Sequence, residues 1–90
     1  MTYYVYMLKT EGIKSVTYVG YTNNLKKRVA LHNAGKAAKF TRGRKWTLIY
    51  KEKFKSKREA ISREYYIKKN RSLRNNIKKK ICENRHITTI

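Results

Sequence analysis

The chain contains no aspartate and no proline, and its 90 residues include a single cysteine, Cys82. One cysteine excludes an internal disulfide, and no cysteine–histidine cluster is present to hold zinc. Because aspartate is absent, all five acidic residues are glutamates, and a two-metal carboxylate cluster is hard to build from them. Any metal centre would therefore depend on one carboxylate together with water and substrate oxygens, an arrangement that Mg²⁺ tolerates.

Long apolar runs are also absent. No segment approaches the length needed to cross a membrane, and residues 1–8 are too few and too rich in tyrosine for a signal peptide. We therefore expect a cytoplasmic protein. A chain of this length buries only about two-thirds of its unfolded surface, so we expect one small domain over residues 1–90, with a core at about 3–70 and a C-terminal helix and tail at 71–90.

Positive charge is the dominant feature that is present. The formal net charge is +19, and the basic residues are spread from Lys9 to Arg85. A fold that repels itself this strongly normally has a polyanionic partner, and nucleic acid, with DNA ranked first, is the leading candidate. An anionic membrane is the weaker candidate, because no helix pairs a broad aromatic and aliphatic face with the charge.

Three short runs rich in aromatic and β-branched residues predict strands at 3–8, 17–21 and 46–54. A turn at Glu11-Gly12 would join the first two as an antiparallel hairpin. A helix is expected over about 25–34, with Asn23 or Asn24 as its cap and Gly35 at its end. The predicted class is therefore α+β, with a small three-stranded antiparallel sheet flanked by about three helices.

Two further helices follow the third strand. The sequence S-K-R-E at 56–59 is a capping box that begins a helix ending near residue 69, and Ala60, Ile61 and Ile67, widened by Tyr65 or Tyr66, would form its apolar side. Ser72 is expected to cap the last helix, in which Leu73, Ile77 and Ile81 recur every fourth residue. Residues 85–90 receive no assignment.

Polar side chains of a reactive kind fall on adjacent elements. Arg28 and His32 are four residues apart and share a helix face, and Glu64 lies on the inward side of its own helix among aliphatic residues. Tyr6 and Tyr18 stand on the two hairpin strands. Each has an ordinary interpretation: Glu64 as a structural ion pair, the tyrosines as core, and Arg28 and His32 as surface residues. Together they are typical of a site that handles phosphate.

Two tripeptides carry a resemblance to a known family. Y-V-Y at 4–6 stands where GIY-YIG domains have G-I-Y, and Y-V-G at 18–20 stands where they have Y-I-G. The helix with Arg28 and His32 follows as that pattern requires, segment 32–42 resembles the connector of the small stand-alone UPF0213 group, and segment 60–69 resembles the glutamate helix. The likeness extends over about 3–70. Tyr4 replaces the motif glycine, and Phe40 replaces a more usual tyrosine.

This resemblance implies a nuclease that hydrolyses phosphodiesters in DNA, in repair or on branched substrates, with one Mg²⁺ or Mn²⁺ ion held by Glu64. Tyr6 would position or deprotonate the attacking water, Tyr18 would hydrogen-bond that water or the phosphate, and Arg28 would clamp the phosphate. His32 would pass a proton or hold an oxygen. Affinity without sequence specificity would come from a group of cations, namely Lys39, Arg42, Arg44 and Lys68.

Two alternatives stay open. The chain could be a nucleic-acid-binding module, for DNA or RNA, that keeps this fold with little or no catalysis, because the charge of +19 suits binding equally well. A basic surface for an acidic protein partner ranks last, since it explains neither Glu64 nor the pair of tyrosines.

Overall fold

The computed structural model describes residues 2–11 and 15–88, with side chains described as far as residue 80. Three strands form one antiparallel sheet in the order β2-β1-β3: β1 (Tyr3–Thr10), β2 (Thr17–Thr22) and β3 (Trp46–Phe54). The helices are α1 (Leu25–Asn33), the short 3-10 helix η1 (Lys39–Thr41), α2 (Lys57–Lys69) and α3 (Arg71–Thr88). The predicted α+β class is confirmed. Part of the hairpin turn predicted at Glu11-Gly12 falls on residues 12–14, which lie outside the described residues.

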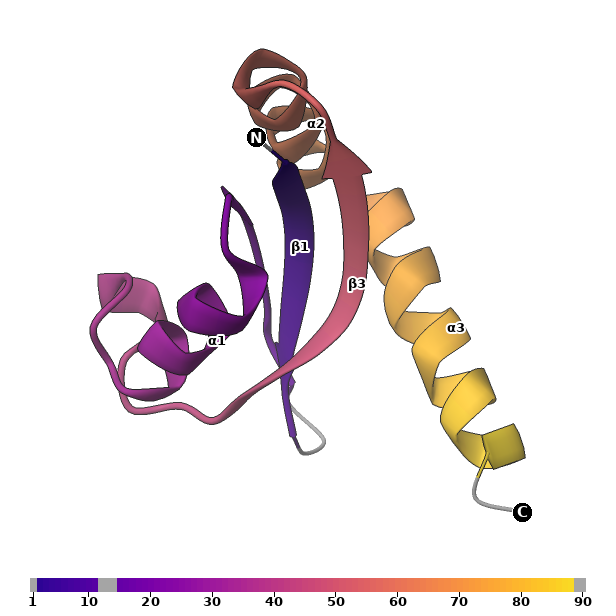
Figure 1. Cartoon of the computed structure of the whole chain (residues 1–90). Coiled ribbons are helices and arrows are strands. Elements are labelled where there is room, and N and C mark those ends of the chain that lie inside the picture. Colours follow the sequence, from indigo (N-terminus) through magenta and orange to yellow (C-terminus); the bar gives the residue numbers. More distant parts are fainter. Residues whose placement is uncertain (1, 12–14, 89–90) are drawn as a thin grey trace.

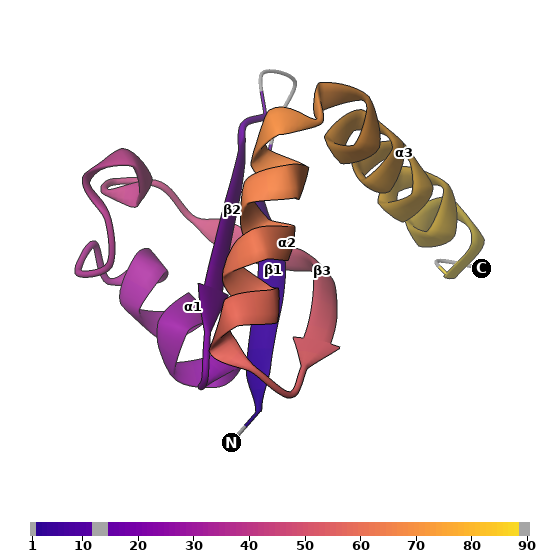
Figure 2. The same ribbon diagram turned by 90° about the horizontal axis from the view of Figure 1, so that it is seen from above.

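The central strand β1 separates two buried clusters. Successive side chains of a strand point to opposite faces, so Val5 and Met7 face one way while Tyr6 and Leu8 face the other. Val5 and Met7 belong to an aliphatic cluster completed by residues of β2, α2 and α3, namely Val19, Ala60, Ile67 and Ile77. Tyr6 and Leu8 pack with Trp46 on the face next to α1. Figure 1 shows α1 and α3 on opposite sides of the sheet, and Figure 2 shows α2 lying over β1 and β2 with its axis roughly along them.

The helices begin and end at residues with a local chemical reason to be there. Asn24 caps α1, since its side-chain oxygen accepts from the Lys27 amide at 3.1 Å. Ser56 caps α2 in the same way, accepting from the Glu59 amide at 3.2 Å. Gly35 follows α1 with a φ of +74°, the left-handed conformation that glycine adopts without strain.

The prediction for the start of α3 was wrong. The helix begins at Arg71, and the side chain that accepts from its first turn is Asn70, whose Oδ1 lies 3.0 Å from the Leu73 amide. Asn70 therefore ends α2 and caps α3, which leaves Ser72 inside the helix. The helix also continues to Thr88, so residues 85–88, left unassigned from the sequence, are helical.

The predicted apolar side of α2 was also too broad. Ala60 and Ile67 are fully buried, but Ile61 is 42% exposed. Ala60 and Ile67 are two turns apart and define the line of contact with the sheet, and Ile61 lies about 100° away from it around the helix. Tyr65 and Tyr66 are exposed too, with the cations of Lys69 and Arg63 against their rings.

Candidate active site

The site is organised around a close approach between Tyr6 and Gly20. The two residues are paired in register on β1 and β2. The Tyr6 phenol lies directly over the backbone of Gly20, because a Cβ added there would sit 2.5 Å from the phenol oxygen. A glycine lets another group come close to the backbone, and here that group is this chain's own Tyr6 side chain.

A cavity of about 410 Å³ opens at this edge of the sheet, along β2. Helix α1 reaches it through Arg28, and α2 reaches it through Lys57 and Glu64. Its lining combines phenols, amides and charged groups, namely Tyr3, Tyr6, Tyr18, Gly20, Tyr21, Thr22, Asn23, Arg28, Lys57 and Glu64. Two phenols, one guanidinium and one carboxylate singled out from the sequence therefore face the same space. Lys57 gave no signal in the sequence beyond its charge.

His32 lies behind Tyr6 and is fully buried. Its Nε2 is 2.8 Å from the Tyr6 hydroxyl, and its Nδ1 is 3.0 Å from the hydroxyl of Thr41. The Thr41 hydroxyl is in turn 2.9 Å from the carbonyl oxygen of Ala38. Three buried polar side chains thus form one continuous hydrogen-bonded chain. Thr41 was not singled out from the sequence, because a threonine in a basic connector has no periodicity that marks it.

Burial keeps both partners of the Tyr6–His32 hydrogen bond neutral. Desolvation, with a smaller contribution from Tyr18, raises the pKa of Tyr6 above its usual value, and Arg28 only partly opposes this. Desolvation also lowers the pKa of His32, and the positive charge of Arg28 lowers it further. Tyr6 therefore carries its proton at neutral pH, and His32 has a free nitrogen lone pair.

Glu64 lies on the same line of α2 as the buried Ala60 and Ile67, and its side chain is only 16% exposed. Its carboxylate forms an ion pair with Lys68, in which Oε1 lies 3.1 Å from the lysine Nζ. The same ammonium group lies 5.9 Å from the centre of the Tyr18 ring. Lys68, predicted as part of a backbone-tracking surface, is thus placed beside the carboxylate.

The Glu52 carboxylate of β3 has a structural partner and does not line the cavity. Arg63 donates to both of its oxygens, at 2.9 and 3.0 Å, and the Tyr50 hydroxyl donates to it as well. These bonds lower the pKa of Glu52 although burial opposes the change. Glu64, by contrast, lines the cavity.

The residues that the structure describes include no group of three or more histidine, cysteine or acidic side chains that would form a closed metal cage. The donor set at the cavity instead fits a hard divalent cation held by the Glu64 carboxylate, with water and phosphate oxygens completing its shell. Such an ion would share this carboxylate with Lys68 or displace it.

Arg28 stands one turn before His32 on α1 and is half-buried at the cavity. Over the part of the chain with described side chains, no hydrogen bond or ion pair engages its guanidinium. The group is therefore free to take an anionic ligand. Guanidinium groups bind phosphate through two parallel N–H bonds.

The other predicted cations are exposed and lie outside the cavity lining, on the connector between α1 and β3 (residues 34–45): Lys39, Arg42 and Arg44. The Arg44 guanidinium lies 5.6 Å from the centre of the Phe40 ring. Phe40 is 52% exposed and stacks on Tyr18, with ring centres 6.3 Å apart. Tyr18 thus links the exposed connector to the cavity.

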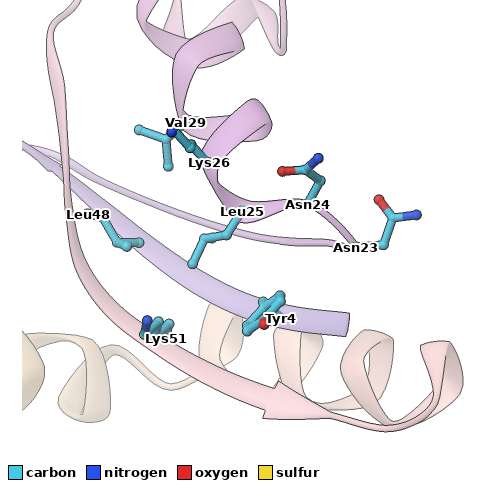
Figure 3. A pocket seen from close by; sticks show the side chains of 8 residues that line it. All are labelled: Tyr4, Asn23, Asn24, Leu25, Lys26, Val29, Leu48 and Lys51. Atoms are coloured by element: carbon cyan, nitrogen blue, oxygen red, sulfur yellow. The ribbon is translucent and has the colours of Figure 1, made fainter. Parts of the chain in front are cut away.

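A second and larger cavity, of about 590 Å³, lies between α1 and the sheet (Figure 3). Its walls are mostly apolar, with lysines and amides among them: Tyr4, Asn23, Asn24, Leu25, Lys26, Val29, Leu48 and Lys51. Tyr4, which stands at the position of the motif glycine, forms part of the wall. This cavity contains neither a carboxylate nor the pair of phenols, so the chemistry described above belongs to the smaller one.

The family model for the GIY-YIG catalytic domain matches residues 2–79. The chain belongs to this family, and the resemblance expected from the two tripeptides is confirmed. Among its relatives, UPF0213 protein CPE1444 of Clostridium perfringens is 57% identical over 67 residues, which cover 73% of this chain and 70% of the relative. UPF0213 protein SH2523 of Staphylococcus haemolyticus is 49% identical over 67 residues, covering 73% and 79%.

A solved structure has the same fold. The solution NMR structure of UPF0213 protein BH0048 from Bacillus halodurans matches with a TM-score of 0.52 and 37% identity, over 86% of this chain and 82% of that one. Within the described residues, no helix is long and apolar enough to cross a membrane.

Proposed function

We propose that this chain is a divalent-metal-dependent endonuclease that hydrolyses phosphodiester bonds in DNA. One observation carries the proposal: the Tyr6 and Tyr18 phenols, the Arg28 guanidinium and the partly buried Glu64 carboxylate line the same polar cavity. Hydrolysis of a phosphodiester needs a placed water, a cation for the non-bridging oxygens and stabilisation of the leaving oxygen. The cavity offers a group for each need, and the family is one of nucleases.

Arg28 binds the scissile phosphate in this mechanism. Its planar donors match two phosphate oxygens, and its half-buried position strengthens the interaction as negative charge builds on the phosphorus centre. The Tyr18 hydroxyl donates a hydrogen bond to the same phosphate or to the attacking water. A divalent ion bound by Glu64 would neutralise charge on the non-bridging oxygens and on the leaving 3′ oxygen.

Tyr6 and His32 handle the proton of the attacking water. A buried phenol of raised pKa is a poor base by itself, but its hydroxyl lies 2.8 Å from His32 Nε2, which can take its proton. As the water oxygen bonds to phosphorus, its proton passes to the Tyr6 oxygen, and the Tyr6 proton passes to His32. The bond from phosphorus to the 3′ oxygen breaks, and that oxygen keeps the electron pair and takes a proton from solvent.

The exposed cations supply affinity for the backbone. With a net charge of +19, the chain binds polyanions without reading sequence, and Lys39, Arg42 and Arg44 extend this surface from the connector. Release of counterions makes such binding weaken steeply with added salt.

The test compares two glutamates of the same helix. We expect purified protein to convert supercoiled plasmid to nicked circles with Mg²⁺ or Mn²⁺, and Glu64→Gln to lower this rate by about 100-fold or more. Glu59→Gln changes the charge equally on the exposed first turn of α2 and is expected to keep the wild-type rate. A similar pair is available on α1: Arg28→Gln is expected to lower the nicking rate, and Lys27→Gln, which removes a neighbouring exposed charge, is expected to keep it.

The same variants address the binding-module alternative, which the net charge favours. Glu64→Gln is expected to bind DNA at least as tightly as wild type, with the same steep salt dependence, because the variant removes a negative charge. Wild-type protein that binds DNA in this way but leaves plasmid intact with either metal would refute the nuclease and favour the module.

A further inference from the structure

The Thr41 hydroxyl has one proton and two neighbours close enough to receive it. One is the Ala38 carbonyl oxygen at 2.9 Å, and the other is His32 Nδ1 at 3.0 Å. A carbonyl oxygen only accepts hydrogen bonds, whereas an imidazole nitrogen donates or accepts according to the tautomer. If the proton went to His32, two oxygens with lone pairs would face each other at 2.9 Å, which is repulsive. The proton therefore points at Ala38.

This assignment determines the protonation of the histidine ring. The Thr41 oxygen is left as an acceptor, so His32 Nδ1 must carry a hydrogen and donate it to Thr41. A neutral imidazole holds one such hydrogen, which leaves Nε2 as a bare acceptor 2.8 Å from the Tyr6 hydroxyl. We infer that Thr41 is a positioning residue that fixes the tautomer of His32 so that Nε2 receives the Tyr6 proton, an inference whose catalytic part rests on the proposed function.

Thr41 is held rigidly enough for this role. It has no exposed surface, and its amide donates to the Ala38 carbonyl at 3.2 Å. Its own carbonyl accepts from the Trp46 indole N–H at 2.9 Å. The backbone on both sides is therefore fixed before the hydroxyl meets the histidine, and the partner of His32 Nδ1 cannot move away without breaking bonds in the connector and in β3.

The tautomer sets the direction in which a proton can travel. With Nε2 bare, the Tyr6 proton points at His32, and the remaining lone pairs of the phenol face the cavity, where they can accept from a water molecule. With the opposite tautomer, Nε2–H would donate to the Tyr6 oxygen, and the phenol would have no base behind it. Thr41 thus acts on the water through two other side chains and never touches substrate.

Nitrogen NMR of the histidine ring tests this directly. In uniformly ¹⁵N-labelled protein at neutral pH, a long-range ¹H–¹⁵N spectrum distinguishes protonated from bare ring nitrogens, and the loss of one set of signals in His32→Gln assigns them. We expect a protonated Nδ1 and a bare Nε2 for His32. A protonated Nε2 in the wild-type protein would overturn the inference, and this measurement needs neither a variant fold nor any activity.

Two substitutions of Thr41 then distinguish the effect of its hydroxyl group from the effect of its shape in the core. Thr41→Val keeps the shape and removes the hydroxyl, and is expected to lose the protonated Nδ1 signature, while Thr41→Ser is expected to keep it. Circular dichroism and the amide spectrum check that each variant folds. A folded Thr41→Val with an unchanged tautomer would refute the role of Thr41.

Nicking assays supply the functional readout. Thr41→Val is expected to cleave about 100-fold more slowly than wild type, and Thr41→Ser to recover most of the rate. Wild-type rates in a folded Thr41→Val variant whose tautomer has changed would refute the catalytic part of the inference. If the wild type itself cleaves nothing while the ring signals behave as expected, the nuclease proposal fails and the assignment of the tautomer to Thr41 holds.

Discussion

The two faces of the sheet bury different chemistry. The face covered by α2 and α3 holds an aliphatic cluster, and its side chains interact only through close packing. The face next to α1 buries an aromatic cluster together with the polar side chains of His32 and Thr41. Both faces share β1, whose residues alternate between them, so Tyr6 and Met7 are chain neighbours with opposite surroundings.

The two faces have different tasks: one stabilises the fold, and the other holds polar groups in fixed positions. Aliphatic burial stabilises the fold at about 25 cal/mol per Å² of apolar surface and tolerates changes of the same volume. A buried polar chain contributes little net stability, yet each group in it must keep its partner. The face of α1 therefore depends on exact pairing, and the face of α2 and α3 supports it.

Truncation in the aliphatic cluster should give the largest effect on stability. Ile67→Ala creates a cavity at a fully buried position and is expected to lower the free energy of unfolding by about 2–5 kcal/mol. Ile61→Ala, on the exposed side of the same helix, is expected to change it by about 0.5 kcal/mol or less. Urea denaturation measures both, and equal losses would show that the face of α2 was wrongly assigned.

Crowding the contact between Tyr6 and Gly20 should have a medium effect. Gly20→Ala places a Cβ where the phenol lies, so we expect a loss of about 1–3 kcal/mol in the free energy of unfolding and a displaced Tyr6 ring. In a Tyr6→Leu background the same substitution is expected to cost less, because the phenol is gone. A double-mutant cycle measures this coupling, and an additive result would contradict the contact.

The smallest expected effect is a dependence of the free energy of unfolding on pH, which comes from His32 on the polar face. His32 has a lowered pKa when folded, so between that value and about 6.5 the unfolded chain binds more protons than the folded one. The stability that this group contributes is complete above about pH 6.5 and is lost as the pH falls through the folded value. Thermal melting across this range should show a decline that His32→Gln makes shallower, and identical slopes would argue against a buried neutral histidine.

The elements could be predicted where the determinants are local. The bounds of β3, the Ser56 cap and the glycine that follows α1 were read from neighbouring residues, and the structure agrees. The predictions for Ser72 and Ile61 were wrong, because Asn70 competes for the cap and because the face of a helix depends on what packs against it. Hydrophobic periodicity reveals neither the alternative cap nor the surface against which a helix packs.

The site was predictable only in part for a related reason. Tyr6, Arg28 and Glu64 were singled out by residue type and by their positions on adjacent elements, and the structure places all three on one cavity. Their roles stay predictions. Thr41 and Lys57 were missed, since their importance arises from contacts between elements that spacing along the chain does not encode.

Trp46 gives the molecule a built-in optical reporter. It is the only tryptophan in the chain, it is almost completely buried, and its indole N–H is bonded to the carbonyl of Thr41. Emission from this one fluorophore should shift to longer wavelength when the connector loosens and water reaches the ring. The state of the segment that orients His32 can therefore be followed in real time, without a label, while a polyanion or a metal ion is titrated.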